Sequence, residues 1–321
     1  MLLCVCLGSV NIPLRDTLAA MWSAVSKTPA PEGVATSIIL SVRLPRVFCV
    51  ALVGSALSLT GASMQGLLRN PLADGSTLGV SSGAALGAVI AIALGISVPG
   101  LPFAGTMVMA MAFAFLSLIV ILSLAYRLDY SLSTNTIILV GVVFSMFANS
   151  IMSFMITFAG EKLRSITFWT MGSLAQSSYL NALVLLIALI VFGGILTAHA
   201  RELNAFAVGE DNARHIGVNV RRVKMTVMIT ASCLIGVCVS IGGTIGFVGL
   251  VIPHMSRMLV GPNHKKLLPA SIFAGAIFLM LADLAGRTLI RPLELPIGVV
   301  TSFIGSVAFV YILYTSRKRG R

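Results

Sequence analysis

The stretch RELNAFAVGEDNARHIGVNVRRVK, residues 201–224, interrupts a chain that is otherwise apolar almost everywhere. It carries eight charged side chains in 24 positions, and about 200 residues of membrane-like sequence precede it. Charge is expensive to place in lipid, so a charged segment between two hydrophobic blocks must lie in water. We interpret it as a docking platform for a soluble partner, and an ordinary connecting loop is the other interpretation that the composition allows.

The composition around this stretch is that of a polytopic membrane protein. Hydrophobic residues make up 57% of the 321 residues and charged residues only 10%, whereas a typical soluble domain has about 25% charged residues. The net charge of +12 therefore describes orientation in the membrane rather than nucleic-acid binding. The five cysteines all lie in apolar runs and show no zinc-ligand spacing with histidine, so no metal site is expected.

Nine runs are apolar enough for membrane spans, each of which needs about 20 residues. They lie at about 45–66, 78–97, 101–125, 132–158, 180–198, 225–241, 245–260, 267–286 and 296–315. The first ten residues, MLLCVCLGSV, make a poor signal peptide and are interpreted as the end of a tenth helix. With the basic tail 317–321 in the cytoplasm, alternation places 14 of the 22 Lys and Arg residues inside, including those of 201–224.

Two glycine-rich segments indicate special helix geometry. Gly79, Gly83 and Gly87 repeat at four-residue spacing, which lets membrane helices approach closely. The glycines of 242–249 and the following Pro253 predict a bent or broken helix. Broken helices often mark moving or substrate-facing parts of transporters.

Polar residues within one span allow two interpretations. Asn149, Ser150 and Ser153 lie along the predicted span 132–158. They either face a polar path or hydrogen-bond to a neighbouring helix.

Several functional classes lack their sequence signatures. No G-x-x-x-x-G-K-[ST] motif occurs, so ATP binding by a P-loop is not expected. None of the ten carboxylates falls in the middle of a predicted span; Asp74 is assigned to a loop and Asp283 to a helix end. Ion-coupled carriers usually need an ionisable group in the membrane, so this pattern weakens the carrier interpretation. Nothing resembles a catalytic triad, and we do not expect an enzyme.

A set of short motifs occurs in order along nearly the whole chain. Each is weak alone, but together they resemble the FecCD family, the permease subunits of bacterial ABC importers for iron–siderophore complexes, haem and vitamin B12. The motifs are RLPR (43–46), QGLLRNPLAD (65–74), LGVSSGA (78–84), LSTN (132–135), FWTMGSL (168–174), LNAFAVGEDNARHIGV (203–218), GTIGFVGLVIPH (243–254), LAD (281–283) and ELPIG (294–298).

The resemblance implies an all-α polytopic fold of about ten transmembrane helices, like a type II ABC importer permease, with residues 1–321 as a single transmembrane domain. It implies a multi-pass protein of the bacterial cytoplasmic membrane with its C-terminus in the cytoplasm. Two cytoplasmic ABC ATPases would hydrolyse ATP, so ATP and Mg belong to that partner and no cofactor is expected in this chain. An external substrate-binding protein and a second permease, identical or related, would complete the importer, with the substrate crossing between the two permeases.

The resemblance also implies roles for particular residues. Two short cytoplasmic helices would couple the permease to the ATPase, outer arginines would meet acidic residues of the binding protein, and the start of the fifth helix would form the cytoplasmic gate. The matching positions are Leu203, Gly209, Glu210, Ala213, Arg214 and Gly217 for coupling, Arg43, Arg46 and Arg287 for docking, and Ser133, Thr134 and Asn135 for the gate.

The substrate is less well indicated than the class. We favour a ferric siderophore because that is the commonest use of the family, with haem and cobalamin as alternatives within it. An ATP-independent carrier and a receptor-like scaffold are the alternatives from other classes.

Overall fold

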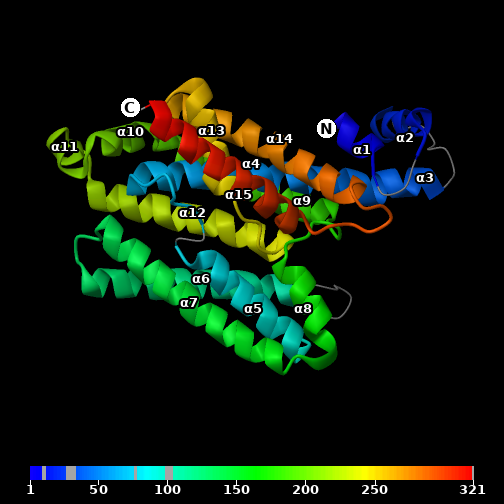
Figure 1. Cartoon of the computed structure of the whole chain (residues 1–321), viewed down its shortest axis with the longest axis horizontal. Coiled ribbons are helices and arrows are strands. Elements are labelled where there is room, and N and C mark those ends of the chain that lie inside the picture. Colours follow the sequence, from blue (N-terminus) through cyan, green and yellow to red (C-terminus); the bar gives the residue numbers. More distant parts are fainter. Residues whose placement is uncertain (9–11, 27–33, 76–77, 98–103, 320–321) are drawn as a thin grey trace.

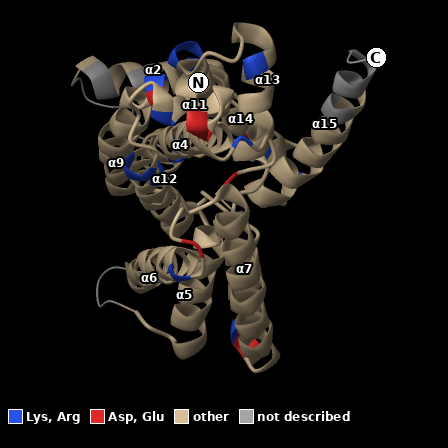
Figure 2. Cartoon of the chain, turned by 90° about the vertical axis from the view of Figure 1, so that its left-hand side faces the viewer, with Lys and Arg blue, Asp and Glu red and all other residues tan. Residues whose placement is uncertain are grey.

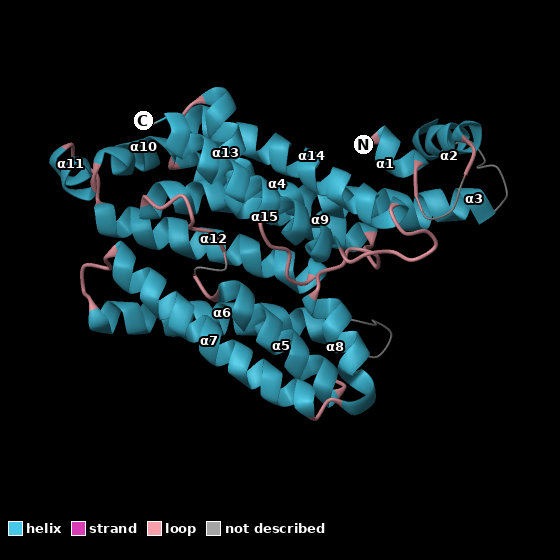
Figure 3. Ribbon diagram, viewed as in Figure 1, coloured by secondary structure: helices cyan, strands magenta, loops and turns pink. Residues whose placement is uncertain are grey.

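The computed structural model describes residues 1–8, 12–26, 34–75, 78–97 and 104–319. These residues form helices joined by loops and turns, and the described part of the chain contains no strand (Figure 3). The first helices are α1 (Leu2–Cys6), α2 (Leu14–Ser26), α3 (Val34–Ser37), the π-helix η1 (Ile38–Arg43), α4 (Leu44–Leu68), α5 (Val80–Leu94), α6 (Ala104–Leu128) and α7 (Thr134–Thr157). They are followed by η2 (Gly160–Lys162), α8 (Leu163–Thr170), α9 (Tyr179–Ala198), α10 (Ala200–Val208), α11 (Glu210–His215), α12 (Val220–Gly242), α13 (Val248–Val260), α14 (His264–Thr288) and α15 (Ile297–Arg319).

Each of the nine predicted spans corresponds to one of these helices: α4, α5, α6, α7, α9, α12, α13, α14 and α15. Within the described residues, six helices are long and apolar enough to cross a membrane, and α5, α13 and the apolar part of α15 are shorter. The all-α membrane fold is therefore confirmed. The count of about ten transmembrane helices stays a prediction.

Helix α4 is the centre of the bundle (Figure 1). The most apolar 18 residues of the span Ala35–Leu68, which contains α4, are 83% buried inside the protein, because α9, α12, α13 and α14 all pack around α4. Glycines make this possible: a Cβ on Gly275 of α14 would overlap the carbonyl oxygen of Gly54, and a Cβ on Gly61 would overlap that of Gly249. Lipid is as apolar as the helix surfaces, so the hydrophobic effect does not drive helices together there. Van der Waals contact between closely approaching backbones stabilises their packing instead.

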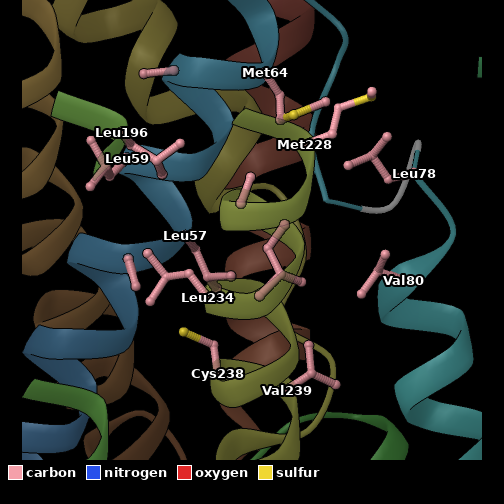
Figure 4. Close-up of a cluster of buried hydrophobic side chains, with 14 of the residues drawn as sticks. Leu57, Leu59, Met64, Leu78, Val80, Leu196, Met228, Leu234, Cys238 and Val239 are labelled. Atoms are coloured by element: carbon pink, nitrogen blue, oxygen red, sulfur yellow. The ribbon is translucent and has the colours of Figure 1, made fainter. Parts of the chain in front are cut away.

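Buried apolar side chains fill the space between α4 and α12. Leu57, Leu59 and Met64 of α4 lie in one cluster with Met228 and Leu234 of α12 (Figure 4). The cluster continues to Leu78 and Val80, at the start of α5 (Figure 4). It therefore joins the central helices to the next group.

Helices α5, α6 and α7 form a second group beside the first, as Figures 1 and 2 show. The small-residue face predicted for α5 is confirmed here. A Cβ on Gly83 would meet Ser117, and one on Gly87 would meet Met109 and Phe113, all on α6.

The connections gather at two opposite ends of the bundle (Figure 1). One end, called the α11 end below, holds α10, α11, the 129–133 turn and the end of α15. The other, called the α1 end, holds α1, α2, α3 and α8. The alternation inferred from basic residues is consistent with this grouping, and the cytoplasmic position of the α11 end stays a prediction.

The predicted break after residue 242 is present. Helix α12 ends at Gly242, and α13 begins only at Val248. Gly243 and Phe247 both have positive φ, +68° and +67°, which stops the α-helix from continuing. Pro253 lies inside α13.

Replacing Gly275 with alanine should lower the thermal stability of the purified protein, because the new methyl group collides with the backbone of α4. Overpacking of this kind typically costs about 1–3 kcal/mol. Gly194 of α9 is the matched control, since a Cβ there meets nothing within 4 Å. Unfolding temperatures in detergent should fall for Gly275→Ala but not for Gly194→Ala, and equal temperatures would show that the α4–α14 crossing is looser than described.

Candidate coupling and gate site

Helix α10 packs against α4 and α14 at the α11 end because one of its faces is apolar. Ala200, Leu203 and Phe206 are buried against the bundle at the spacing of one helix face. Asn204 fastens the same helix to the start of α14. Its Oδ1 accepts the backbone N–H of His264 at 2.8 Å, and its Nδ2 donates to Oδ1 of Asn263 at 2.9 Å.

Helix α11 follows after a single residue, Gly209. The φ of Gly209 is +135°, a conformation that glycine adopts without strain and other residues rarely do. Gly217, just after the helix, also has positive φ, +88°. Ala213 is fully buried and holds α11 against the bundle. The two short helices implied by the resemblance are therefore present, and their coupling role stays a prediction.

The six predicted coupling residues divide into three kinds. Leu203 and Ala213 are buried and support the helices from inside. Gly209 and Glu210 are partly buried. Arg214 and Gly217 are exposed, and Arg214 forms a surface ion pair with Asp211 at 3.5 Å. Arg214 and Gly217 are therefore the most accessible of the six to a partner, and Leu203 and Ala213 are inaccessible.

Two exposed apolar residues beside them were missed by the sequence analysis. Val208 ends α10 with 69% of its surface exposed, and Ile216 follows α11 with 72% exposed. Both residues lie within the charged stretch 201–224, so its average composition hides them. The signal in the sequence is an apolar residue on each side of a six-residue polar helix.

The predicted gate residues begin α7. The carboxylate of Asp129 accepts hydrogen bonds from Ser131 and from the backbone N–H of Ser133, and these bonds hold the pKa of the Asp129 carboxyl well below its usual range. The Ser133 hydroxyl then accepts from the Thr136 N–H as the N-cap of α7. Ser133 thus caps α7, and the gate role of Ser133, Thr134 and Asn135 stays a prediction.

The structure brings the predicted gate and the predicted coupling segment together. Thr134 and Asn135 of α7 and the Gly209–Asn212 segment line one open hollow of about 570 Å³. Leu68 and Arg69, at the end of α4, line it as well. The start of α11 therefore lies next to the start of α7, so a movement of α11 would occur beside the predicted gate.

The polar residues of α7 lie on its exposed side. Asn149, Ser150 and Ser153 are all exposed in the chain. The Ser150 hydroxyl donates to the Met146 carbonyl of its own helix at 2.9 Å. For Ser150 a bond to a neighbouring helix of this chain is therefore wrong, while the polar-path interpretation of the three residues stays a prediction.

Asp74 occupies an unexpected depth. It lies in a loop, as predicted, but this loop turns back into the bundle after α4. Asp74 lines a cavity of about 350 Å³ with Thr60, Ile235 and Gly249. Ile235 is 15 residues into α12, about 22 Å along the helix. The prediction that Asp74 lies in a loop is therefore confirmed, and this loop reaches the middle of α12.

The three arginines assigned to docking are buried at the α1 end, each less than 8% exposed. Arg46 pairs with Asp283 at 2.9 Å and with Glu294 at 2.7 Å, and Arg287 pairs with Asp283 at 2.8 Å. Arg43 donates to the carbonyls of Val5 and Cys6, both at 2.9 Å.

Arg287 donates to two further carbonyls of the same segment, those of Cys4 at 3.0 Å and Leu7 at 3.3 Å. The last carbonyls of a helix lack partners within it, so Arg43 and Arg287 together complete the end of α1. Binding-protein docking through these arginines stays a prediction, and it would require them to leave internal partners.

Comparison with known proteins gives a consistent picture. The sequence profile of the FecCD transport family matches residues 1–315. The ABC transporter permease protein YvrB of Bacillus subtilis is 41% identical over 317 residues, which cover 98% of this chain and 90% of the relative. The cobalamin import system permease protein BtuC of Halobacterium salinarum is 37% identical over 300 residues, 92% of this chain and 78% of the relative.

A solved structure has the same fold. It is that of a metal-chelate type ABC transporter in an inward-facing conformation, and it superposes with a TM-score of 0.82 at 33% sequence identity. The match covers 94% of this chain and 98% of that chain.

Replacing Asp283 with alanine should strongly destabilise the protein, because it leaves the buried cations Arg46 and Arg287 without a shared anion. Removal of one partner from a buried ion pair costs about 3–5 kcal/mol. Asp211→Ala is the control, since its side chain is 88% exposed in its pair with Arg214. The unfolding temperature in detergent should drop only for Asp283→Ala, and an unchanged value would mean that the arginines find other partners.

Proposed function

Because the chain belongs to the FecCD transport family, we propose that it is the membrane-spanning subunit of an ATP-driven importer that passes a large chelate across the cytoplasmic membrane. The relatives and the solved structure described above are ABC transporter proteins. The single observation that carries the proposal is the α10–α11 pair, whose exposed surface lies beside the start of α7. A transporter driven from outside its own chain needs such a surface next to its gate.

The proposed driving partner is a pair of cytoplasmic ABC ATPases. Val208 and Ile216 offer them apolar contact, and the exposed Asp211, Arg214 and His215 surround these two residues with polar groups. An apolar centre with a polar rim is the usual anatomy of a protein interface. ATP and Mg bind to the ATPases, and the permease itself is non-catalytic.

A second permease completes the proposed path. The face of α7 that carries Asn149 and Ser153 also exposes Leu139, Val142 and Met146, at the three- and four-residue spacing of a helix seam. A second copy of this chain, or a related permease, would cover this face, and the substrate would cross between the two. An external binding protein would deliver the substrate at the α1 end.

A ferric siderophore is the proposed substrate, with haem and cobalamin as the alternatives. The comparisons support the importer class more strongly than any one chelate. One relative is a cobalamin permease, whereas the solved structure is that of a metal-chelate type transporter.

Reconstitution tests the function directly. The chain, its cognate ATPase and its binding protein are placed in proteoliposomes, and uptake of labelled ferric siderophore, hemin and cobalamin is measured with and without ATP. The proposal predicts uptake of one of them that requires both ATP and the ATPase. Uptake without the ATPase would instead establish an ATP-independent carrier, and binding without any flux would favour a scaffold.

Changing Val208 and Ile216 together to glutamate should abolish association with the ATPase, because it places charge in the proposed apolar centre. Copurification of the two proteins from detergent is the measurement. Leu289→Glu with Ile290→Glu is the matched control, since both residues are exposed apolar residues after α14, at the opposite end of the bundle. Undiminished copurification of the Val208/Ile216 variant would rule out this surface as the docking site.

A further inference from the structure

Lys224 is a buried cation at the start of α12, in the segment whose charges were expected to lie in water. Its side chain has no exposed surface, although Arg221 and Arg222 just before it are exposed. A buried ammonium group is costly unless charge and hydrogen-bond partners compensate it. Lys224 must therefore have partners that compensate its charge and its three N–H donors.

The Lys224 ammonium joins two segments that are far apart in the sequence. Its Nζ lies 2.7 Å from Oε1 of Glu210 and 2.8 Å from Oε2 of the same carboxylate. The same Nζ donates to the backbone carbonyl of Leu132 at 2.9 Å. Glu210 is the first residue of α11, and Leu132 directly precedes the predicted gate.

The Leu132 side of this bridge is stiff. Leu132 has a φ of +52°, a left-handed conformation that is unfavourable for a leucine, and its side chain is 1% exposed. Its N–H donates to the Asp129 carbonyl at 2.9 Å, and the Asp129 carboxylate holds Ser133 from the other side. A pull on the Leu132 carbonyl therefore moves the 129–133 turn together with the N-terminus of α7.

The Glu210 side is held to the bundle by one buried residue of α11, Ala213. Helix α11 has only six residues and lies between Gly209 and Gly217, both with positive φ. Glycine permits large changes of backbone angle at little cost. The carboxylate of Glu210 can thus follow a rotation of α11 while the ion pair keeps its contact with Lys224.

We propose that Lys224 is a positioning residue that transmits the movement of α11 to the gate through the Glu210–Lys224–Leu132 bridge. This inference rests on the proposed function, in which an ATPase moves α11. The inference adds the route of this movement to the proposed function. The route consists of the ion pair between Glu210 and Lys224, followed by the hydrogen bond from Lys224 to the Leu132 carbonyl. The residue touches neither substrate nor ATPase in this role, since it is fully buried.

Lys224→Met is the variant that removes the connection with least harm to the fold. Methionine has similar length and is apolar, so it can fill the buried space that the Lys224 side chain occupies. The Glu210 side chain, 26% exposed in the pair, can then turn to water. The exposed surface of α11 stays unchanged, so the ATPase should still bind and hydrolyse ATP.

The gate is followed by labelling a cysteine at position 135. Asn135 is exposed at the start of α7, and four of the five native cysteines are buried, with Cys6 partly buried. Asn135→Cys is introduced with Lys224 intact, with Lys224→Met and with Lys265→Met, and each chain is assembled with its ATPase. Maleimide labelling rates are compared without nucleotide and after trapping with ATP and vanadate, and the parent chain without Asn135→Cys gives the background.

The proposal predicts a severalfold nucleotide-dependent change in labelling when Lys224 is intact. It predicts that this change disappears in Lys224→Met while ATP hydrolysis continues. Lys265→Met, which alters an exposed lysine at the same end of the bundle, should behave like the parent. Retention of the full change in Lys224→Met would overturn the bridge and leave the proposed function standing, whereas no nucleotide effect with Lys224 intact would overturn both.

A second variant separates the bridge from a purely structural role. Glu210→Gln weakens the ion pair but leaves Lys224 and its bond to Leu132. The nucleotide-dependent change should shrink in Glu210→Gln, because the neutral amide holds the Lys224 ammonium less strongly than the carboxylate does. A full nucleotide-dependent change in Glu210→Gln would contradict a connection that runs through the ion pair.

Discussion

A charge cannot remain alone in a low-dielectric interior, and the described part of this fold meets that constraint in two places. At the α1 end, Arg46 and Arg287 share Asp283, while Glu294 adds a second anion beside Arg46. At the α11 end, Lys224 shares its charge with Glu210 and one backbone carbonyl. Each cluster ties together segments that are distant in the sequence. The apolar helices between them need only close backbone contacts, which Gly54, Gly61, Gly249 and Gly275 provide.

The two clusters have different surroundings, and this difference suggests different uses. The arginine cluster is closed: its donors also satisfy the last carbonyls of α1, so it fastens the N-terminal segment to α4 and α14. The lysine bridge connects a short helix between two glycines to a stiff turn before α7. One cluster therefore suits a fixed end of the bundle, and the other suits a movable part beside the proposed gate.

The helices could be predicted from the sequence because hydropathy is a local property, and every predicted span has its helix. The break after Gly242 and the close face of α5 could also be predicted, since glycine and proline act on their own backbone. The position of Asp74 inside the bundle could not be predicted, because a surface loop and a re-entrant loop have the same composition. The internal partners of Arg46 and Lys224 could not be predicted either: Asp283 lies 237 residues from Arg46, and nothing in the local pattern shows that Lys224 is buried. The resemblance to a family supplied the coupling helices, but it could not show which of their residues face outward.

A structure of the complex with the ATPase, trapped with ATP and vanadate and determined by electron cryo-microscopy, tests the account most directly. The account predicts that Val208 and Ile216 contact the ATPase and that the Lys224–Glu210 pair is intact. It also predicts that residues 132–135 have moved together with α11 relative to the structure described above. An ATPase bound elsewhere on the chain, or a displaced α11 with residues 132–135 left in place, would contradict it.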